Sequence, residues 1–479
     1  MTEANQDKAL HPTIFVVFGI TGDLAARKLL PALLGLFAKK LLPARWCVIG
    51  FSRRSLGREE FRELVRGRLN IRPGQFKEED VKHFLDHVSY EQGKLDELSS
   101  YERLAGRIKE QDSRWGQCSN KLYHLSVPPA LYEGILRNLA SSGLSKPCAD
   151  ETGWTRVLIE KPFGNDIGHA EALDKLLGKL FKEEQIFRID HYLAKETLQN
   201  ILAFRFHNYL FEPIWNRRFV DKVHVKLFEQ NGVLDRGDTY DAVGALKDVG
   251  QNHMLMMLSA VAMDEPNGYS APSIRRERAK VLARLRQAPS RSAGKCNARG
   301  QYSGYKSEAG VMPDSGTETY FRLKAAISSS RWKGVPFYLE SGKAMAESRT
   351  EIDVYFKNAN GRMRGRNAGN NAVDNQNILT FKIQPNEGIK IKFFVKTPGE
   401  GFRVESKTLK FRYSDVPTDH WQNLPNDYER LIRDAFLGDQ TLFASTDEIM
   451  ASWRFITAVL RDWTKLPLVE YPRGAKEVG

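Results

Sequence analysis

The run RIDHYLAKE, residues 188–196, contains several side chains that bind anions or move protons. Asp190 has the residue type of a helix N-cap, which would place His191 and Lys195 four residues apart on one face of a helix. Free backbone N–H groups and two potential cations at a helix start form an anion site, for which phosphate is the natural ligand. A capped helix with an exposed pair of side chains is the alternative. Two cations at the positive end of a helix dipole are unfavourable without an anion, and this favours phosphate.

A second cluster, DVGQNH at residues 248–253, begins an apolar stretch that runs to Met263. His253 is a candidate general base, because the unperturbed pKa of histidine lies near working pH. A hydrogen-bonded core histidine is the competing interpretation. In an α-helix, five residues at about 100° each would leave Asp248 and His253 about 140° apart, so spacing alone does not make them a catalytic pair.

A glycine turn, GITGDLA at residues 19–25, lies between an apolar strand at 13–18 and a helical pattern through Leu29, Leu33 and Phe37. Its Gly-x-x-Gly spacing departs from the commonest GxGxxG. Glycines allow a turn to approach a pyrophosphate, and the helix start supplies free N–H groups and a positive dipole. An ordinary tight turn between strand and helix is the alternative.

The residues after the second apolar strand, 46–50, bear on the identity of the dinucleotide. An NAD enzyme usually places an acid there for the ribose 2′-hydroxyl. This chain has Ser52, Arg53 and Arg54, which suit a 2′-phosphate. NADP is therefore favoured over NAD, with two solvated loop arginines as the alternative.

The order of expected elements indicates two domains. Strand and helix patterns alternate up to about Gln185, with later strands at 121–127 and 156–160, and a helix at 171–181. Lys161 follows one of these strands in EKPFG, residues 160–164, where open α/β sheets bind ligands. A solvated lysine at a strand end is its alternative.

The rest of the chain shows strands of alternating pattern. They are expected at 222–229, 351–357, 379–384 and 390–395, and the last two are joined by the hairpin-like turn PNEG. The Ser-, Gly- and Arg-rich stretch 288–315 is expected to be a long surface loop. We predict a fold of α/β plus α+β type: an NADP-binding Rossmann domain at 1–188, and a larger domain at 189–479 with a mainly antiparallel sheet flanked by helices.

Composition narrows the class of protein. The 479 residues carry a formal net charge of +13, but Lys and Arg are mixed with Asp and Glu along the chain and are not blocked into a tail. An anionic small-molecule substrate explains the excess as well as nucleic acid does, and no nucleic-acid partner is expected. Without a signal pattern or a long apolar segment, a cytoplasmic protein without a membrane partner is expected. No metal site is expected, because the four cysteines are far apart in the chain: Cys47, Cys118, Cys148 and Cys296.

Four of these runs, in their order along the chain, resemble the glucose-6-phosphate dehydrogenase family: GITGDLA at 19–25, EKPFG at 160–164, RIDHYLAKE at 188–196 and DVGQNH at 248–253. The resemblance extends nearly from end to end and includes FEPIWNR at 211–217, GVPFY at 334–338, RGQY at 299–302, TET at 317–319, QPNEG at 384–388, YERL at 428–431 and GDQTLF at 438–443. It implies oxidation of glucose 6-phosphate at C1 to a 6-phosphogluconolactone with hydride transfer to NADP, the first step of the oxidative pentose phosphate pathway. It also implies a homodimer or homotetramer.

The resemblance assigns roles to individual residues. His253 matches the general base that removes the C1 hydroxyl proton, and Asp190 matches the carboxylate that orients its imidazole. Glu229 and Asp248 match acceptors of sugar hydroxyls. Matches to the phosphate site are His191, Tyr192, Lys195 and Lys343. Matches on the cofactor side are Gly19, Thr21, Gly22, Asp23, Leu24, Lys28, Ser52, Arg53 and Lys161, the last bridging sugar and cofactor next to Pro162.

Several positions depart from the family pattern. Ala194 replaces a glycine and Ala26 a lysine, and Glu340 and Ser341 stand where Arg-Thr is usual. The basic residue expected five positions after Lys343 is Ser348, followed by Arg349. These departures concern phosphate affinity and substrate range more than the reaction.

Two other classes of function compete with this one. A different two-domain sugar oxidoreductase with a Glu-Lys-Pro motif would use the lysine as acid/base and need no phosphate site, which the His191 and Lys195 pair disfavours. A catalytically idle basic module would hold nucleic acid or a protein. The presence of His253, Asp190 and Lys161 disfavours that alternative.

Overall fold

The computed structural model describes residues 11–69, 71, 74–148, 153–288, 297–358, 376–399, 404–416 and 425–478. The chain forms two compact units. Unit 1 comprises Met1–Ala194, Tyr269–Arg275 and Pro425–Thr446, and unit 2 comprises Lys195–Gly268, Arg276–Leu424 and Asp447–Gly479. The boundary at 188/189 stays a prediction, and the two short later segments of unit 1 were not indicated by any local pattern.

Unit 1 is built on a seven-stranded sheet in the order β16-β6-β5-β4-β1-β2-β3. Its strands are β1 (Thr13–Phe18), β2 (Trp46–Ser52), β3 (Val88–Gln92), β4 (Asn120–Leu125), β5 (Thr155–Ile159), β6 (Ile186–Ile189) and β16 (Phe443–Ala444). All neighbours pair parallel except β16 with β6. Every residue of β1 is buried, as expected for a parallel strand covered on both faces. The order 3-2-1-4-5-6 of the parallel strands is that of a Rossmann fold, which confirms the predicted class.

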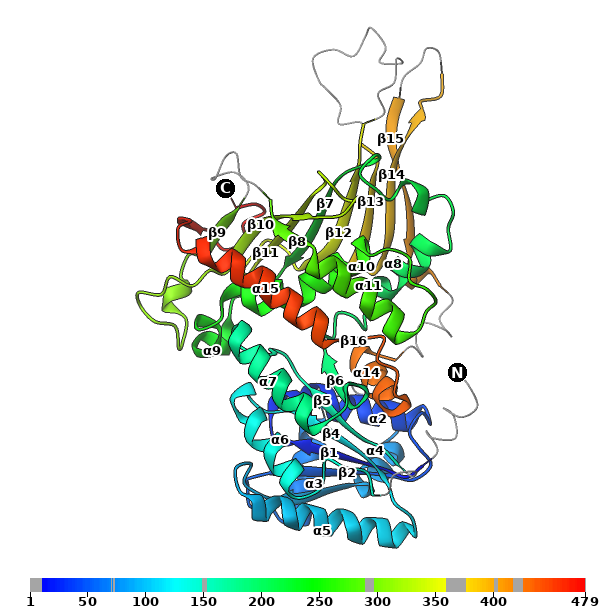
Figure 1. Cartoon of the computed structure of the whole chain (residues 1–479), viewed down its shortest axis with the longest axis vertical. Coiled ribbons are helices and arrows are strands. Elements are labelled where there is room, and N and C mark those ends of the chain that lie inside the picture. Colours follow the sequence, from blue (N-terminus) through cyan, green and yellow to red (C-terminus); the bar gives the residue numbers. More distant parts are fainter. Residues whose placement is uncertain are drawn as a thin grey trace. The chain divides into compact units, whose positions relative to one another are not determined.

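Helices cover this sheet. They are the π-helix η1 (Ala25–Leu29), α2 (Leu30–Ala38), α3 (Arg58–Arg68), α4 (Glu78–Asp86), α5 (Leu98–Trp115), α6 (Tyr132–Ser141), α7 (Ile167–Leu180) and α14 (Asp427–Leu437). Along the chain, α5 contacts α6 and α6 contacts α7, whereas α2 contacts α4 and α14 (Figure 1). The core strands are therefore enclosed by helices from both early and late parts of the sequence.

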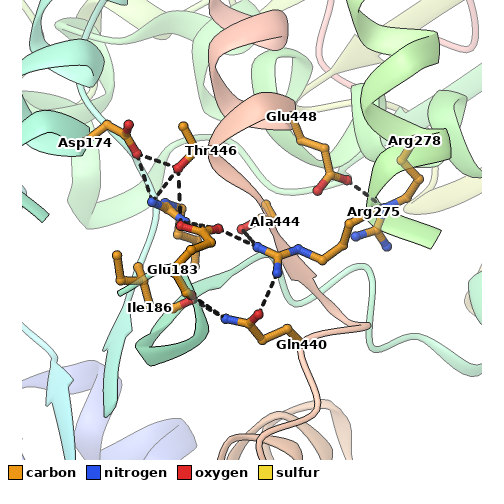
Figure 2. Close-up of polar contacts among 10 residues, drawn as sticks. Asp174, Glu183, Ile186, Arg275, Arg278, Gln440, Ala444, Thr446 and Glu448 are labelled. Atoms are coloured by element: carbon orange, nitrogen blue, oxygen red, sulfur yellow. Dashed lines mark hydrogen bonds and ion pairs between the residues drawn. The ribbon is translucent and has the colours of Figure 1, made fainter. Parts of the chain in front are cut away.

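A polar network explains why the late segments belong to unit 1 (Figure 2). The buried Arg188 on β6 donates hydrogen bonds to Asp174 at 2.8 Å and to Thr446 at 2.8 Å. Arg275, also buried, donates to Glu183 at 2.7 Å and to Gln440 at 2.6 Å. Buried guanidinium groups need such partners, because an unpaired buried charge is strongly destabilising. These two arginines thus tie residues 269–275 and 425–446 to the edge of the sheet.

Unit 2 contains a ten-stranded sheet in the order β15-β14-β13-β12-β7-β11-β10-β9-β17, with β8 also pairing with β10. Its strands are β7 (Val220–Phe228), β8 (Leu285–Gln287), β9 (Ala298–Tyr302), β10 (Tyr320–Ile327), β11 (Pro336–Gly342), β12 (Arg349–Phe356), β13 (Ile378–Gln384), β14 (Gly388–Lys396), β15 (Val404–Arg412) and β17 (Leu468–Tyr471). Only the pairs β7–β11 and β9–β17 are parallel among the strands that the structure describes in this unit. The prediction of a mainly antiparallel sheet is confirmed.

Alternation along the strands gives this sheet one apolar face. On β7, Val223, Val225 and Leu227 are buried, and lysine and histidine side chains occupy the positions between them. The helices of the unit are α8 (Glu196–Phe206), α9 (Gly237–Asp241), the π-helix η6 (Leu246–Met254), α10 (Leu255–Ala262), most of α11 (Ala271–Ala283) and nearly all of α15 (Thr446–Trp463). Helix α8 contacts β13 and α10, and η6 contacts β7 and β11. The sheet therefore supports the helix that carries His253.

The surface loop predicted at 288–315 is wrong for part of its length. Residues 289–296 lie outside the described residues, but 298–302 form the buried strand β9 between β10 and β17. Gly300 suggested a loop, yet a Cβ there would lie 2.9 Å from the carbonyl oxygen of Val469. The glycine thus permits the close approach of β17. The hairpin predicted between β13 and β14 is confirmed, with Asn386 in the left-handed region at φ 58°.

Candidate functional site

The glycine turn of unit 1 lies where the strand order reverses, between β1 and its neighbours β2 and β4. Gly19 has φ +81°, and a Cβ on it would lie 2.3 Å from the carbonyl oxygen of Ser126. The turn is closed by the N–H of Gly22, which donates to the carbonyl of Gly19 at 2.9 Å. Open α/β sheets bind their ligands at this reversal, and the helical residues that follow, beginning with Asp23 and Leu24, supply free N–H groups. The positive φ and the close approach to Ser126 both require glycine at residue 19, and the turn that results suits a pyrophosphate.

The end of β2 lies next to this turn. The hydroxyl of Thr21 donates to the Oγ of Ser52 at 3.4 Å, and the Oγ of Ser52 lies 2.8 Å from the Tyr90 hydroxyl. Arg53 and Arg54 are exposed, and neither forms an ion pair with any residue that the structure describes. Uncompensated guanidinium groups at this position suit a 2′-phosphate.

Lys28 and Arg68 are two further basic groups of this half-site. Lys28 is exposed on η1, in the helix that begins at the glycine turn. Arg68, at the end of α3, donates a short hydrogen bond to the carbonyl of Thr21. Sequence reasoning missed Arg68, because it lies far from any motif, and only the packing of α3 brings it to the turn. Asp23 pairs with Arg27 at 3.3 Å on the exposed side of the helix.

Lys161 follows β5 and precedes a cis peptide bond to Pro162. Its neighbour Glu160 is buried and accepts a hydrogen bond from the Tyr428 hydroxyl at 3.1 Å. Burial and the Glu160 charge both raise the pKa of Tyr428, so the phenol stays protonated and remains a donor. The Tyr428 ring stacks on His191 at 6.5 Å between ring centroids. Lys161 and His191 are thus linked within unit 1 through Glu160 and Tyr428, a connection that sequence reasoning did not find.

The predicted helix start at Asp190 is wrong. The 190–194 segment forms turns, and α8 begins at Glu196 with Lys195 as its N-cap residue. The Asp190 carboxylate instead accepts from the backbone N–H of Tyr192 at 3.1 Å, a local turn that competes with helix formation. His191 and Lys195 therefore do not share a helical face, and they fall in unit 1 and unit 2 respectively.

In unit 2, Glu229 and Lys343 follow two parallel neighbours, β7 and β11, at the same edge of the sheet. Phe228 is in register with Gly342, and the N–H of Glu229 donates to the carbonyl of Gly342 at 2.9 Å. The buried ammonium of Lys343 lies 2.5 Å from a carboxylate oxygen of Glu229 and 3.9 Å from one of Asp248. It also lies 5.2 Å from the Tyr240 ring centroid. Together these groups form a donor between two acceptors, a pattern suited to sugar hydroxyls.

Asp248 and His253 both lie on the nine-residue π-helix η6, which continues into α10. A π-helix bonds residue i to residue i+5, so residues five apart lie on the same face. The α-helical estimate that separated these two side chains by about 140° is therefore corrected. His253 is 2% exposed, and its backbone N–H donates to the Asn252 side-chain oxygen at 2.6 Å. π-Helical turns often occur at functional sites.

The residues that depart from the family pattern have structural partners. Glu340 accepts from the Tyr320 hydroxyl at 2.5 Å and lies 2.8 Å from the Nε2 of His224. Ser348 accepts from the N–H of Gln230 at 2.9 Å, and Arg349 pairs with Glu347 at 3.2 Å. None of these contacts involves Lys343. The three substituted positions therefore form their own contacts and leave the ion pairs of Lys343 with Glu229 and Asp248 in place.

Cys118 and Cys148 come together in the fold, although their sequence spacing suggested no cluster. Their sulfur atoms and an Asp112 carboxylate oxygen lie within 4.8 Å of one another. The Lys121 ammonium lies 2.8 Å from the Cys148 sulfur and 3.6 Å from Asp112. Burial raises the pKa of Cys148 to about 11, so its thiol is largely protonated at neutral pH. Lys121 already supplies the positive charge of this group.

Most of the chain matches two family models. Residues 16–200 match the model described as glucose-6-phosphate dehydrogenase, NAD binding domain, and residues 202–478 match the C-terminal domain of the same family. Within the described residues, no helix has both the length and the apolar character needed to span a membrane.

Curated relatives and solved structures agree with these models. The chain is 41% identical to the glucose-6-phosphate 1-dehydrogenase of Aggregatibacter actinomycetemcomitans over 93% of this chain and 90% of that protein. It is 39% identical to that of Borreliella burgdorferi, covering 97% and 95%. A solved glucose-6-phosphate dehydrogenase in complex with its substrate glucose-6-phosphate superposes with a TM-score of 0.88 at 32% identity, covering 98% of this chain and 95% of that one.

Proposed function

Since the chain belongs to the glucose-6-phosphate dehydrogenase family, we propose that it oxidises glucose 6-phosphate at C1 to 6-phosphogluconolactone with NADP as hydride acceptor, the first step of the oxidative pentose phosphate pathway. The observation that carries this proposal is the Lys343, Glu229 and Asp248 cluster, with His253 on the same π-helix as Asp248. Hydroxyl-binding groups and a candidate base thus stand together within unit 2.

The cluster binds the sugar ring in this proposal. Glu229 and Asp248 accept hydrogen bonds from sugar hydroxyls, and the Lys343 ammonium donates to them. The positive charge of Lys343 is already neutralised by the carboxylates of Glu229 and Asp248. The negative charge of a phosphate would therefore be bound more strongly by other cations. His191, Tyr192 and Lys195 are proposed to bind the phosphate, and Lys343 is proposed to contribute mainly at the adjoining hydroxyls.

His253 is proposed to remove the C1 hydroxyl proton. His253 is buried on η6, which suits a positioned base. Asp190 of unit 1 is proposed to orient this imidazole and to stabilise its protonated form, as the third member of such arrangements does. Family membership supports this pairing.

The family requires a nicotinamide cofactor, which when bound accepts the hydride released from C1. NADP is the proposed form, supported by the exposed Arg53 beside Ser52 and by the absence of an acid at this strand end. The remaining proposed contacts are those of Gly19, Thr21, Gly22, Asp23, Leu24 and Lys28, with Lys161 bridging sugar and cofactor. We further propose a cytoplasmic homodimer or homotetramer that binds neither nucleic acid nor membrane.

The test is the rate of reduced-cofactor formation by the purified chain. We expect turnover with glucose 6-phosphate and NADP, much weaker turnover with NAD, and almost none with free glucose. Equal rates with glucose and glucose 6-phosphate would favour a sugar oxidoreductase without a phosphate site. No reduction with any sugar would favour the idle binding module.

A further inference from the structure

The carbonyl groups at the end of α10 are held by three buried side chains. The indole N–H of Trp215 donates to the carbonyl of Val261 at 2.8 Å, and that of Trp332 donates to Ala262 at 2.8 Å. The guanidinium of Arg205 donates to Val261 at 3.0 Å and to Met263 at 2.8 Å. A helix end leaves its last carbonyls unpaired, so these donors satisfy groups that would otherwise be buried alone.

Arg205 is itself fixed by ion pairs. It is 0% exposed and pairs with Glu212 at 3.0 Å, and Glu212 also accepts from Arg331 at 2.6 Å. Arg331 in turn pairs with Asp264 at 2.7 Å, just beyond α10. Glu212 and Trp215 belong to FEPIWNR, residues 211–217, a run to which the proposed reaction assigns no role. Arg205 without Glu212 would be an uncompensated buried charge, which is strongly destabilising, so Arg205 cannot readily move away to follow a displaced end of α10.

The other end of the same helical segment is also anchored. The buried carboxylate of Glu318 accepts from the N–H of Leu246, the first residue of η6, at 3.1 Å. Gly244 just before it has φ +73°, and a Cβ there would lie 2.7 Å from this carboxylate. The segment from Leu246 to Ala262 is therefore held at its first N–H and at its last carbonyls.

Because the segment is fixed at Leu246 and at Ala262, the number of helical turns between these two residues is fixed as well. A π-helix is rarer and less favourable than an α-helix of the same residues. Relaxation of η6 to α-helix would rotate every later residue of the segment about the axis, by about 100° for each residue of offset. The carbonyls of Val261 and Ala262 would then turn away from Trp215 and Trp332. The anchors of α10 thus oppose the relaxation that would separate Asp248 from His253.

We propose that Trp215, Trp332 and Arg205 are positioning residues that hold the π-helical register of η6 and so keep Asp248 and His253 on one face. This inference rests on the proposed function, which assigns the sugar and the proton to these two side chains. The three side chains bind carbonyl groups at the C-terminal end of α10, so they act on η6 through the helical backbone between them. Loss of the π-helical register would therefore change two things at once. Asp248 would bind the sugar hydroxyls differently, and His253 would be displaced from the proton that it removes.

The experiment uses the full chain with Trp215→Phe, Trp332→Phe and the double variant. Phenylalanine keeps most of the buried ring but lacks the indole N–H. We expect the double variant to lower kcat by about tenfold or more, because small displacements of reacting groups are costly. The KM for glucose 6-phosphate should rise, the KM for NADP should stay unchanged, and the acidic limb of the pH profile should shift. A purely structural loss would reduce the active fraction and leave both KM values and the pH profile as they were.

Trp453→Phe is the matched control, since this tryptophan is equally buried in unit 2 but lies on α15. We expect it to lower thermal stability without the KM shift for the sugar phosphate. The inference is overturned if the double variant changes neither KM nor pH profile, or if Trp453→Phe changes them equally. The His253→Asn variant, measured in parallel, distinguishes a failure of the proposed function from a failure of the anchoring inference. Unimpaired turnover there contradicts the proposed function, whereas impaired turnover there with an unaffected double variant contradicts only the anchoring inference.

Discussion

The ammonium of Lys343 lies 2.5 Å from a carboxylate oxygen of Glu229, and both residues follow parallel strands at one edge of the unit 2 sheet. Burial leaves Lys343 dependent on this partner and on Asp248, which lies farther away at 3.9 Å. The pair therefore presents a buried donor, the Lys343 ammonium, beside a partly exposed acceptor, the Glu229 carboxylate, whose side chain is 41% exposed.

Replacement of Glu229 by Gln removes the nearer charge and one strong acceptor. We expect the KM for glucose 6-phosphate to rise about tenfold, which corresponds to about 1.4 kcal/mol for a charged hydrogen bond, with the KM for NADP unchanged. Steady-state kinetics with each substrate varied measures this. Glu405→Gln, which breaks the surface pair with Lys407 on β15, is the control and should leave both constants unchanged. An unchanged sugar-phosphate KM in Glu229→Gln would remove Glu229 from the substrate site.

Replacement of Arg53 by Ala tests the cofactor preference. Loss of a charge-assisted hydrogen bond to a 2′-phosphate should raise the KM for NADP by about 10- to 100-fold, while the KM for NAD, which lacks this phosphate, should not change. Arg45→Ala is the control, because this exposed arginine of unit 1 donates to the backbone carbonyl of Trp115 at 2.9 Å, away from the glycine turn. Equal effects on NADP and NAD would place Arg53 elsewhere on the cofactor.

Replacement of Gly19 by Ala tests the pyrophosphate cradle. The new Cβ would need a positive φ and would lie 2.3 Å from the Ser126 carbonyl oxygen. We expect the free energy of unfolding to fall by about 2 kcal/mol or more, and cofactor binding to be lost. In contrast, a Cβ on Gly106 of α5 meets nothing within 4 Å, and Gly106→Ala should add about 0.5–1 kcal/mol of stability. Urea unfolding and cofactor titration would show whether the two glycines behave alike.

Asp434 of α14 gives unit 1 a pH-dependent stability. Burial and the nearby charge of Asp439 raise the pKa of Asp434 to about 7. The folded chain therefore binds more protons than the unfolded chain between about pH 4 and pH 7, so this group makes stability fall as the pH rises through that window. A tenfold change in the proton affinity of one group corresponds to about 1.4 kcal/mol, so the loss of stability across the window is at most about 4 kcal/mol.

Replacement of Asp434 by Asn should remove most of this dependence, because the amide stays neutral at every pH. Urea midpoints at about pH 5 and about pH 8 should differ less in the variant than in the parent chain. The exposed Asp415 offers a control, since Asp415→Asn should leave the difference between the two midpoints intact. An equal midpoint difference in the parent chain and in Asp434→Asn would show that Asp434 is already ionised in the fold at about pH 5.

Local patterns predict the parts of the fold that local interactions determine. The apolar run of β1, the glycine turn and the helix after it are visible in the sequence because each depends on its own residues. The hairpin at Asn386 is visible for the same reason. In contrast, β9 is not, because Gly300 serves the approach of β17, a strand far away in the chain.

The site shows the same division. Residue type, spacing and the family resemblance indicate the candidate residues. They do not indicate the π-helix that aligns Asp248 with His253, because its register depends on anchors at Glu318 and at the end of α10. The residue type of Asp190 permits a helix N-cap, whereas its side chain forms a turn with Tyr192. Arg68 reaches the glycine turn through tertiary packing alone.

The central claim is that this chain oxidises glucose 6-phosphate with His253 as the base. The most direct measurement compares kcat of the parent chain with that of His253→Asn, together with the dissociation constant of glucose 6-phosphate for each. We predict that the parent chain turns over and that kcat of the variant falls by about 100-fold or more, with sugar-phosphate binding largely preserved. Undiminished turnover in a folded His253→Asn variant would contradict the account.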